Sequence, residues 1–332
     1  MKTIFILTIS LFCSITGFSQ VELPYIDKFN TKLNMRLGLV NAGNNIEIEN
    51  EDDVEYKLSP NESLKLNLTA NYDFLSLSFS YTPNFIPGNN DNEVKGFTNT
   101  RNFGLNLFLN RVFGRLDLNR TEGYNLTNTK EIFPEHPDKY IIYDNLIRKQ
   151  VRLELGYNTN KNYSYRASTI FNEKQNISAG SFIPRVIFSH LKHTRNEDNL
   201  IRERVNNYWA VTGNYNHTFV MKKHFFITTG LGLGTGLAKV SEIDSDDIIA
   251  EKNYTNLLIA AQFIFHFGYN SDRYFFGVSS HSNTSAEIIK EVENSIQDQT
   301  IIGQFYFGYR FGAPKILKKS FDGIKGIFRK KK

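Results

Sequence analysis

Hydrophobic and polar residues alternate with a period of two along most of this chain. In the segment 75–81, Leu-Ser-Leu-Ser-Phe-Ser-Tyr, every odd position is apolar and every even position is serine. Such alternation is typical of a β-strand whose two faces meet different surroundings. About thirteen segments of roughly ten residues show it, so the sequence predicts an all-β fold. The apolar faces of other expected strands include Leu33, Met35, Leu37 and Leu39, then Phe103, Leu105, Leu107 and Leu109, then Val151, Leu153, Leu155 and Tyr157, and finally Phe305, Phe307, Tyr309 and Phe311.

The composition of the polar faces of these segments distinguishes a membrane barrel from a secreted β-sandwich. A face exposed to water would be rich in Lys, Glu and Thr, whereas here it is mostly small or amide-bearing, as at Asn102, Gly104 and Asn106. Small residues and amides fit a crowded, hydrated interior. Aromatic residues gather at strand ends, where lipid headgroups would lie, at Tyr72, Tyr81, Tyr157, Tyr163, Tyr215, Phe219, Tyr269 and Phe311. We therefore expect a closed antiparallel transmembrane β-barrel in a bacterial outer membrane.

The connections between the expected strands differ in length. Tight turns are expected at 72–73, 110–111, 158–162, 221–223 and 270–272, and long polar loops at 41–62, 83–97, 122–148, 238–253 and 282–298. Short turns at one end and long loops at the other are usual in transmembrane barrels. A long connection at 191–204 breaks this order. Because such barrels have an even number of strands, we expect twelve, with fourteen as the alternative.

The first twenty residues carry the three parts of a secretory signal peptide. Lys2 precedes the apolar stretch 3–12, and Gly17-Phe18-Ser19 offers a cleavage point before Gln20. Cys13 follows a bulky Phe12, which argues against a lipoprotein signal. Removal of residues 1–19 leaves a mature chain without cysteine, which suits an oxidising compartment. No other apolar run is long enough to cross a bilayer as a helix.

One segment carries a resemblance to a known family. The stretch from Asn172 to Phe182 resembles the QKKSAGSF segment of the bacterial family named domain of unknown function 4421. Its later blocks are similar to Gly213-Asn214-Tyr215 with 219–226, to 268–273 with Phe276-Gly277, and to 308–311. The resemblance spans residues 27 to 312 and implies an outer-membrane-type β-barrel without an assigned activity, so it transfers no catalytic residue. The chain departs from the family at Gly213-Asn214-Tyr215, where Gly-Tyr would be closer, and in its basic C-terminus.

The C-terminal tail, residues 314–332, differs in charge from the expected barrel, residues 20–313. The tail carries eight basic residues and one acid, Asp322, whereas the mature chain before it has 30 basic and 33 acidic residues. Four apolar residues recur at spacings of four, three and four, namely Leu317, Phe321, Ile324 and Phe328. A helix would place them on one stripe opposite the lysines. Two readings remain open: an amphipathic helix on the inner membrane surface, or a solvated tail.

Charged residues inside the expected strands fall almost wholly on the polar face. They are Arg36, Lys65, Arg115, Asp117, Arg152, Glu154, Arg166, Arg185 and Arg310. A charge on the lipid face would cost about 2 to 4 kcal/mol near the midplane, so this distribution supports a barrel. Arg115 and Arg152 each lie two residues from an acid, and we expect some pairs to link strands. The excess of positive charge would favour anions in the lumen.

The sequence contains no convincing catalytic, metal or cofactor site. Ser279, His281 and Asn283 share one strand face in a triad-like set. That face is expected to line the lumen, whereas a phospholipid would approach from the outer wall, so we expect no catalytic residue and no enzyme. The glycines from Gly230 to Gly236 do not form a phosphate-binding loop, because they alternate along a strand. No metal-ligand spacing joins His190, His193 and His217.

Three functions from different classes remain. We expect a pore or transporter for small solutes, with an electropositive lumen. The alternatives are a structural or adhesive surface barrel with an occluded lumen and, more distantly, an integral membrane lipid hydrolase. The expected partners are outer-membrane lipid and small anionic solutes. We expect no nucleic-acid partner for an exported protein, despite its net charge of +5. The oligomeric state is left open.

Overall fold

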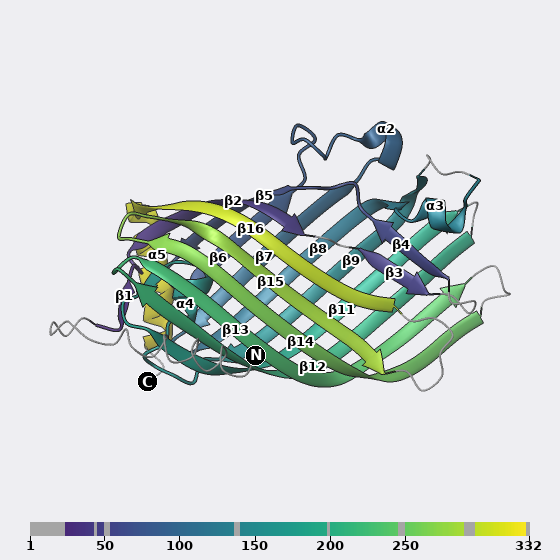
Figure 1. The fold of residues 1–332 in the computed structure, drawn as a ribbon. Coiled ribbons are helices and arrows are strands. Elements are labelled where there is room, and N and C mark those ends of the chain that lie inside the picture. Colours follow the sequence, from purple (N-terminus) through teal and green to yellow (C-terminus); the bar gives the residue numbers. More distant parts are fainter. Residues whose placement is uncertain are drawn as a thin grey trace, which may run out of the picture.

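Twelve antiparallel strands form a closed barrel in the computed structural model (Figure 1). The described residues are 24–42, 45–49, 54–135, 140–197, 200–244, 250–288 and 296–329, so the expected signal peptide lies outside them. Pairing of the last strand with the first closes the barrel. The predicted fold class and the number twelve are confirmed. The barrel strands are β2 (Lys32–Ala42), β5 (Lys65–Tyr72), β6 (Leu75–Tyr81), β7 (Asn99–Leu109), β8 (Val112–Leu126), β9 (Ile141–Tyr157), β11 (Ala179–Glu197), β12 (Leu200–Met221), β13 (Phe225–Asp244), β14 (Ala250–Asn270), β15 (Tyr274–Ile288) and β16 (Ile296–Gly312).

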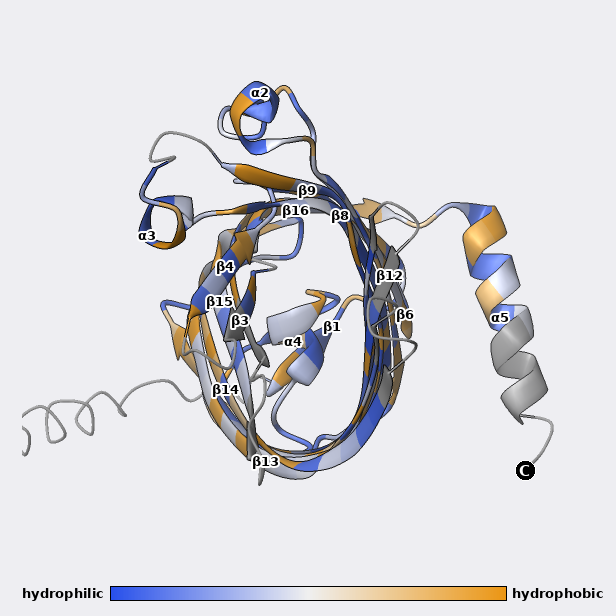
Figure 2. Ribbon diagram, turned by 90° about the vertical axis from the view of Figure 1, so that its right-hand side faces the viewer, coloured by the Kyte–Doolittle hydropathy of each residue, from blue (hydrophilic) through white to orange (hydrophobic). Residues whose placement is uncertain are grey.

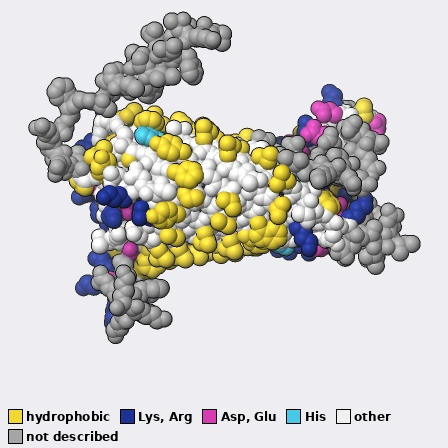
Figure 3. Space-filling view, turned by 90° about the horizontal axis from the view of Figure 1, so that it is seen from below, with side chains coloured by type: hydrophobic (Ala, Val, Ile, Leu, Met, Phe, Trp, Pro, Cys, Tyr) yellow, Lys and Arg dark blue, Asp and Glu magenta, His cyan; other side chains and the backbone are white. Residues whose placement is uncertain are grey.

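The apolar faces of the strands form the outer surface of the barrel. On β13, Leu231 and Leu233 are exposed, whereas Thr228 and Ala238 are buried. Figure 3 shows hydrophobic side chains spread over the middle of the visible wall, with charged side chains near its two ends. An apolar outer wall of this kind faces lipid, and closure of the sheet satisfies the backbone hydrogen bonds there.

Glycines on β13 make room for longer side chains inside the barrel. Gly232 pairs with Asn214 on β12 and with Gln262 on β14. A Cβ atom at position 232 would overlap the Asn214 amide. Across this glycine, Asn214 Nδ2 donates to Gln262 Oε1 at 2.6 Å. The alternating glycines therefore allow side chains of β12 and β14 to meet inside the barrel.

Short turns gather at one end of the barrel, as the sequence predicts. They join β5 to β6, β7 to β8, β12 to β13 and β14 to β15. Asp73, Asn110, Lys222 and Lys223 adopt positive φ angles in three of these turns, which asparagine and aspartate tolerate better than most residues. Such short turns face the periplasm in barrels of this kind, so we call this the periplasmic end.

Three expectations about connections were wrong. The segment 238–253 is not a long loop, because β13 and β14 pair as far as Asp244 and Ala250. The segment 191–204 is not a long loop, because β11 and β12 continue as one hairpin in which Glu197 pairs with Leu200. The connection after β9 is not a short turn at 158–162, since it runs to residue 178 before β11 begins. The chain thus places its longest periplasmic connection where the sequence predicts a tight turn.

A hairpin completes the wall at the opposite, outer end. Its strands are β3 (Ile46–Glu49), which pairs with β16, and β4 (Glu55–Ser59), which pairs with β8. The hairpin therefore spans the place where β5, β6 and β7 are too short to extend the wall. Gly123, with a φ of +87°, lies at a register shift in β8 just before this pairing. The short helices α2 (Asn92–Lys95) and α3 (Thr129–Ile132) lie outside the ring of strands (Figure 2).

The long periplasmic connection folds into the barrel as a plug. The plug comprises α4 (Tyr165–Thr169) and β10 (Glu173–Gln175), together with β1 (Ile26–Lys28), which pairs with β10. Figure 2, which looks along the barrel, shows α4 and β1 inside the ring of strands. A helix inside the barrel is absent from the sequence-based expectation, which gives a turn at 158–162 and then a wall strand that contains Arg166.

The chain ends in a helix outside the barrel. Helix α5 (Lys315–Arg329) follows β16 and lies at the periplasmic end (Figure 1). The described helices are all too short or too polar to cross a membrane.

Candidate functional site

Two aromatic clusters hold the plug against opposite parts of the wall. On one side, Tyr163 and Ile170 pack with Phe108, Phe113 and Ile183 of the wall. On the other side, Phe171 packs in the second cluster, with Phe226, Phe275 and Tyr306. The Phe171 ring stacks on that of Phe275 with centroids 4.8 Å apart.

The backbone at Phe171 is strained, and its surroundings compensate for this. Its φ angle is +58°, a value that a bulky side chain rarely adopts. The ring is fully buried. A residue keeps such a conformation only where the packing and hydrogen bonds around it outweigh the cost of the strain. The aromatic cluster supplies those surroundings, so Phe171 is an anchor of the plug.

Polar side chains of the wall satisfy the carbonyl groups at the end of α4. The last carbonyls of a helix have no partner within the helix. Arg36 Nη1 donates to the Thr169 carbonyl at 3.2 Å, and Asn71 Nδ2 donates to the Ile170 carbonyl at 2.8 Å. A hydrogen bond of 3.2 Å joins His266 Nδ1 to the Ser168 carbonyl.

The next carbonyl of the plug, that of Phe171, has two partners on the wall. Asn34 Nδ2 and Arg310 Nε each donate to it at 3.2 Å. Together with the bonds to α4, donors from β2, β5, β14 and β16 hold consecutive plug carbonyls. Because these strands lie far apart in sequence but converge on one turn of chain, the wall fixes the plug in place.

A charged pair lies within the plug itself. Glu173 accepts a hydrogen bond from Ser164 Oγ at 2.6 Å and lies 3.6 Å from Arg166 Nη1. Arg166 also donates to Asn172 Oδ1 at 2.9 Å and to the Asp73 carbonyl. Burial lowers the pKa of the Arg166 guanidinium, and the charges of Glu173 and Asp73 oppose that shift. The plug therefore pairs this charge with its own Glu173, and Asp73 in the turn between β5 and β6 contributes as well.

Above the plug, charged side chains of four strands face a common space, which we call the chamber. Arg115 Nε lies 2.7 Å from Asp117 Oδ2 on β8. Glu154 on β9 receives Arg152 at 3.4 Å and Arg185 of β11 at 3.2 Å. Arg36 of β2 completes this set of four arginines and two acids, which leaves two positive charges uncompensated within the set.

The chamber is accessible to solvent and retains unused donors. The Arg115 side chain is 49% exposed although it faces inward. The Arg185 side chain is only 4% exposed, and its Nε and Nη2 atoms have no hydrogen-bond partner among the described residues. Arg36 Nε likewise has no hydrogen-bond partner among the described residues. A buried N–H group without a hydrogen-bond partner destabilises the fold. These groups are therefore available to donate hydrogen bonds to a bound acceptor.

Three predicted lumen residues have other surroundings than the sequence suggested. Arg166 lies on α4 in the plug and not on a wall strand, which corrects its predicted position. Lys65 is buried against Glu62 at 2.6 Å, and Arg310 donates to the plug. The predicted balance of seven positive charges against two acids was therefore too positive, since Glu62 and Glu173 also lie inside. Glu62 precedes β5 in an expected loop, so the alternation along a strand could not show that its side chain points inward.

The triad-like set lies on β15 inside the barrel. Asn283 accepts a hydrogen bond from Gln262 Nε2 at 2.7 Å, and Gln262 also accepts from Arg185 Nη1 at 3.1 Å. His281 interacts electrostatically with Arg36, Arg115 and Arg185. These contacts make the β15 residues part of the chamber wall.

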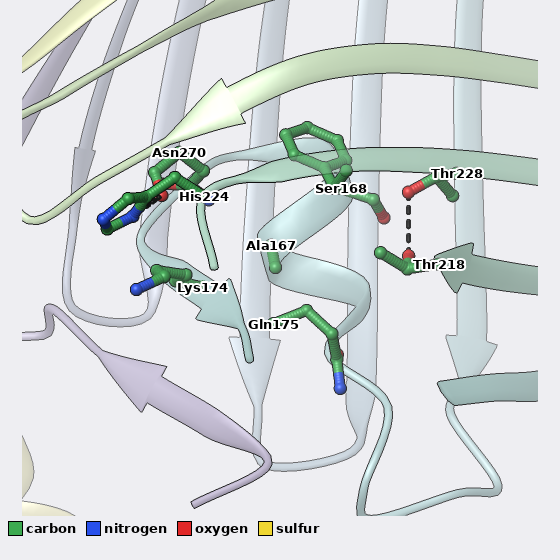
Figure 4. A pocket seen from close by; sticks show the side chains of 9 residues that line it. Ala167, Ser168, Lys174, Gln175, Thr218, His224, Thr228 and Asn270 are labelled. Atoms are coloured by element: carbon green, nitrogen blue, oxygen red, sulfur yellow. Dashed lines mark hydrogen bonds between the residues drawn. The ribbon is translucent and has the colours of Figure 1, made fainter. Parts of the chain in front are cut away.

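A small pocket separates the plug from β12 and β13. Figure 4 shows Ala167 and Ser168 of α4 on one side of it and Thr218 and Thr228 of the wall on the other. The two threonine hydroxyls are joined by a hydrogen bond of 2.7 Å. Lys174 also lines the pocket and is itself buried. No bulky ligand fits here, and the pocket marks a seam between plug and wall.

Of the four apolar tail residues that the sequence singles out, the structure describes the side chains of Leu317 and Phe321. Both pack against the outside of the barrel, and Phe321 lies in a cluster with Tyr72 and Ala313. The side chains of Ile324 and Phe328 lie outside the described residues.

Solved structures similar to this chain are bacterial outer-membrane barrels of low sequence identity. The Escherichia coli outer membrane protease OmpT matches with a TM-score of 0.41 and 7% identity, over 86% of this chain and 98% of OmpT. LpxR from Salmonella typhimurium matches with a TM-score of 0.36 and 10% identity, over 82% and 99% of the two chains. The Pseudomonas putida toluene transporter TodX matches with a TM-score of 0.31 and 8% identity, over 85% and 91%. No curated protein matches the sequence.

One of these neighbours corrects the expectation that the chain is not an enzyme. The Escherichia coli outer membrane protease OmpT is an enzyme, so the expectation of no enzyme, which was based on the inward face of Ser279 and His281, does not stand.

A family comparison accounts for nearly the whole barrel. The family described as "Domain of unknown function (DUF4421)" matches residues 23–311. This range begins just before β1 of the plug and ends at β16. It includes the stretch 172–182, which forms β10 and the start of β11 and was the one sequence signal that touched the plug. The chain belongs to the DUF4421 family.

Proposed function

We propose that this outer-membrane barrel binds a small oxyanion in the chamber, receives it from the outer mouth, and is closed towards the periplasm by the plug. The bonds between the wall and the plug carbonyls are the observation that carries this proposal. An open diffusion pore would need a continuous lumen, whereas this lumen contains a helix that is anchored on two sides. Passage of solute would require the plug to move.

The chemistry of the chamber supports an oxyanion as the solute. Arg36 and Arg185 present unused N–H donors, and Arg115 is reached by solvent. Guanidinium groups bind carboxylate and phosphate oxygens with paired hydrogen bonds. The surplus of positive charge in a confined space further favours anions over cations.

Equilibrium binding to the purified, folded barrel tests the proposal. Inorganic phosphate and succinate serve as probes in calorimetric titrations at low ionic strength. Replacement R185Q and, separately, R115Q should each weaken binding by about tenfold, because each removes a charge-assisted hydrogen bond. The control is R120Q, on the same strand as Arg115 but on its outward face, where Arg120 pairs with Glu122.

The results of this test separate the alternatives. Weaker binding in both chamber variants and unchanged binding in R120Q support the proposed site. Equal affinity in all four proteins would overturn it and would favour an occluded surface barrel. Preference between phosphate and succinate assigns the class of oxyanion.

A further inference from the structure

Helix α5 lies across the barrel rather than along it. In Figure 1 the barrel runs horizontally while α5 stands upright at the periplasmic end. In Figure 2, which looks along the barrel, α5 is again seen from its side and lies outside the ring of strands. The two views agree that the helix axis is roughly perpendicular to the barrel. A membrane that surrounds the barrel would therefore run parallel to α5 at its periplasmic face.

One side of α5 is docked on the wall. The Phe321 ring lies 4.8 Å from the Tyr72 ring, edge to face, and 5.1 Å from the Phe74 ring. Leu317, one turn earlier, packs into the same cluster, beside Leu33. These contacts fix the height of α5 at the last residues of β5 and the first residues of β2, which is the rim of the apolar wall.

A second apolar position on α5 has no protein partner among the described residues. Ile316 is 82% exposed, and it lies next to Leu317 and hence on the flank of the docked side. Lys315, Lys318 and Lys319 are exposed. Helical spacing places Lys315 and Lys319 on the side of α5 opposite Leu317, and Lys318 on the flank opposite Ile316. A helix with an apolar flank and a lysine-rich face is the kind that lies in a membrane interface.

We propose that α5 is an interfacial helix that inserts Ile316 among the acyl chains of the inner leaflet and binds anionic phospholipid headgroups through Lys315, Lys318 and Lys319. The orientation of the helix, its docking at the rim of the apolar wall and its charge all point to this occupant. The helix thereby fixes the depth of the barrel in the bilayer and gathers anionic lipid at its periplasmic rim.

Fluorescence quenching in vesicles tests the insertion. The only tryptophan, Trp209, is replaced by phenylalanine, and I316W then reports on the position of α5 in the reconstituted full-length chain. Two vesicle preparations contain equal parts of phosphatidylglycerol and phosphatidylcholine and differ only in which lipid carries brominated chains. Quenching in either preparation indicates insertion. Emission typical of water, without quenching in either, would overturn the proposal.

The same vesicles test the selectivity for anionic lipid. Brominated phosphatidylglycerol should quench about twofold more than brominated phosphatidylcholine, as expected for a local excess of anionic lipid. The triple variant K315Q, K318Q and K319Q should abolish this difference while the barrel remains folded, as judged by its heat-modifiable mobility. The control K222Q and K223Q removes two exposed lysines from a turn at the same end and should retain the difference. An undiminished difference in the triple variant would contradict the assigned role of the lysines.

Discussion

Arg310 on the last barrel strand donates a hydrogen bond from Nε to the carbonyl oxygen of Phe171 in the plug, at 3.2 Å. The guanidinium of Arg310 also donates to the Ser271 carbonyl and to Asn270 Oδ1. It therefore joins β16, the turn before β15 and the plug. A charged donor that holds a buried carbonyl in this way contributes to stability and also determines where the plug sits.

Replacement R310Q should loosen the plug while the barrel stays closed. It leaves buried carbonyl groups without a charged donor, at a cost of about 1 to 3 kcal/mol. Limited proteolysis from the periplasmic side should then cut within residues 158–178 of the variant and spare the wild type. R273Q, at an exposed residue of the nearby turn, is the control. Equal resistance of all three proteins would show that Arg310 does not hold the plug.

Replacement F171A should open the lumen. It removes a fully buried ring at the centre of the aromatic cluster and should cost about 3 to 5 kcal/mol. In planar bilayers the wild type should show little conductance, and F171A should show stable channels. Phe305 has a largely exposed side chain on the outer wall, so F305A should behave as the wild type. Large stable channels in the wild type would contradict a closed lumen.

The channels of F171A should prefer anions. With the plug loosened, ions pass the four arginines and two acids of the chamber, whose surplus charge is positive. Reversal potentials in a salt gradient measure this preference, and R152A in the F171A background should reduce it. Cation preference would show that the arginines serve only to link strands.

Replacement G232A should destabilise the barrel more than G303A. A Cβ at position 232 would overlap the Asn214 amide that reaches Gln262, whereas nothing lies near a Cβ at position 303. Overpacking of this kind typically costs about 1 to 3 kcal/mol. The temperature at which heat-modifiable mobility is lost measures the effect. Equal temperatures for both variants would show that β13 tolerates side chains inside the barrel.

Cell fractionation tests the predicted location. The chain without residues 1–19 should be recovered with the outer membrane and should migrate faster unheated than heated, as folded barrels do. The apolar outer wall is the physical reason, since it is stable only in lipid. Recovery of intact protein from the soluble periplasm would refute this location.

The sequence by itself determined the barrel. Period-two alternation is a local property, so the outward position of residues such as Leu37, Leu153 and Phe307 could be read without any knowledge of their partners. Closure followed because an open edge is not stable in lipid. The count of twelve was obtained despite the misread segment 191–204, where polar and charged residues on both faces of β11 and β12 hid strands that extend past the membrane.

Only the tertiary structure decided what fills the barrel. The plug has no alternation to reveal it, and its bonds join residues far apart in the chain, as between Asn71 and Ile170. Strand parity placed Arg36, Arg115 and Arg185 on the inner face, beside Asp117 and Glu154. It could not show that Glu173 of the plug pairs with Arg166, or that Glu62 pairs with Lys65 from a loop. The same limit applies to α5. Its apolar stripe was visible in the sequence, whereas its docking on Tyr72 and its orientation across the barrel depend on where β5 ends in space.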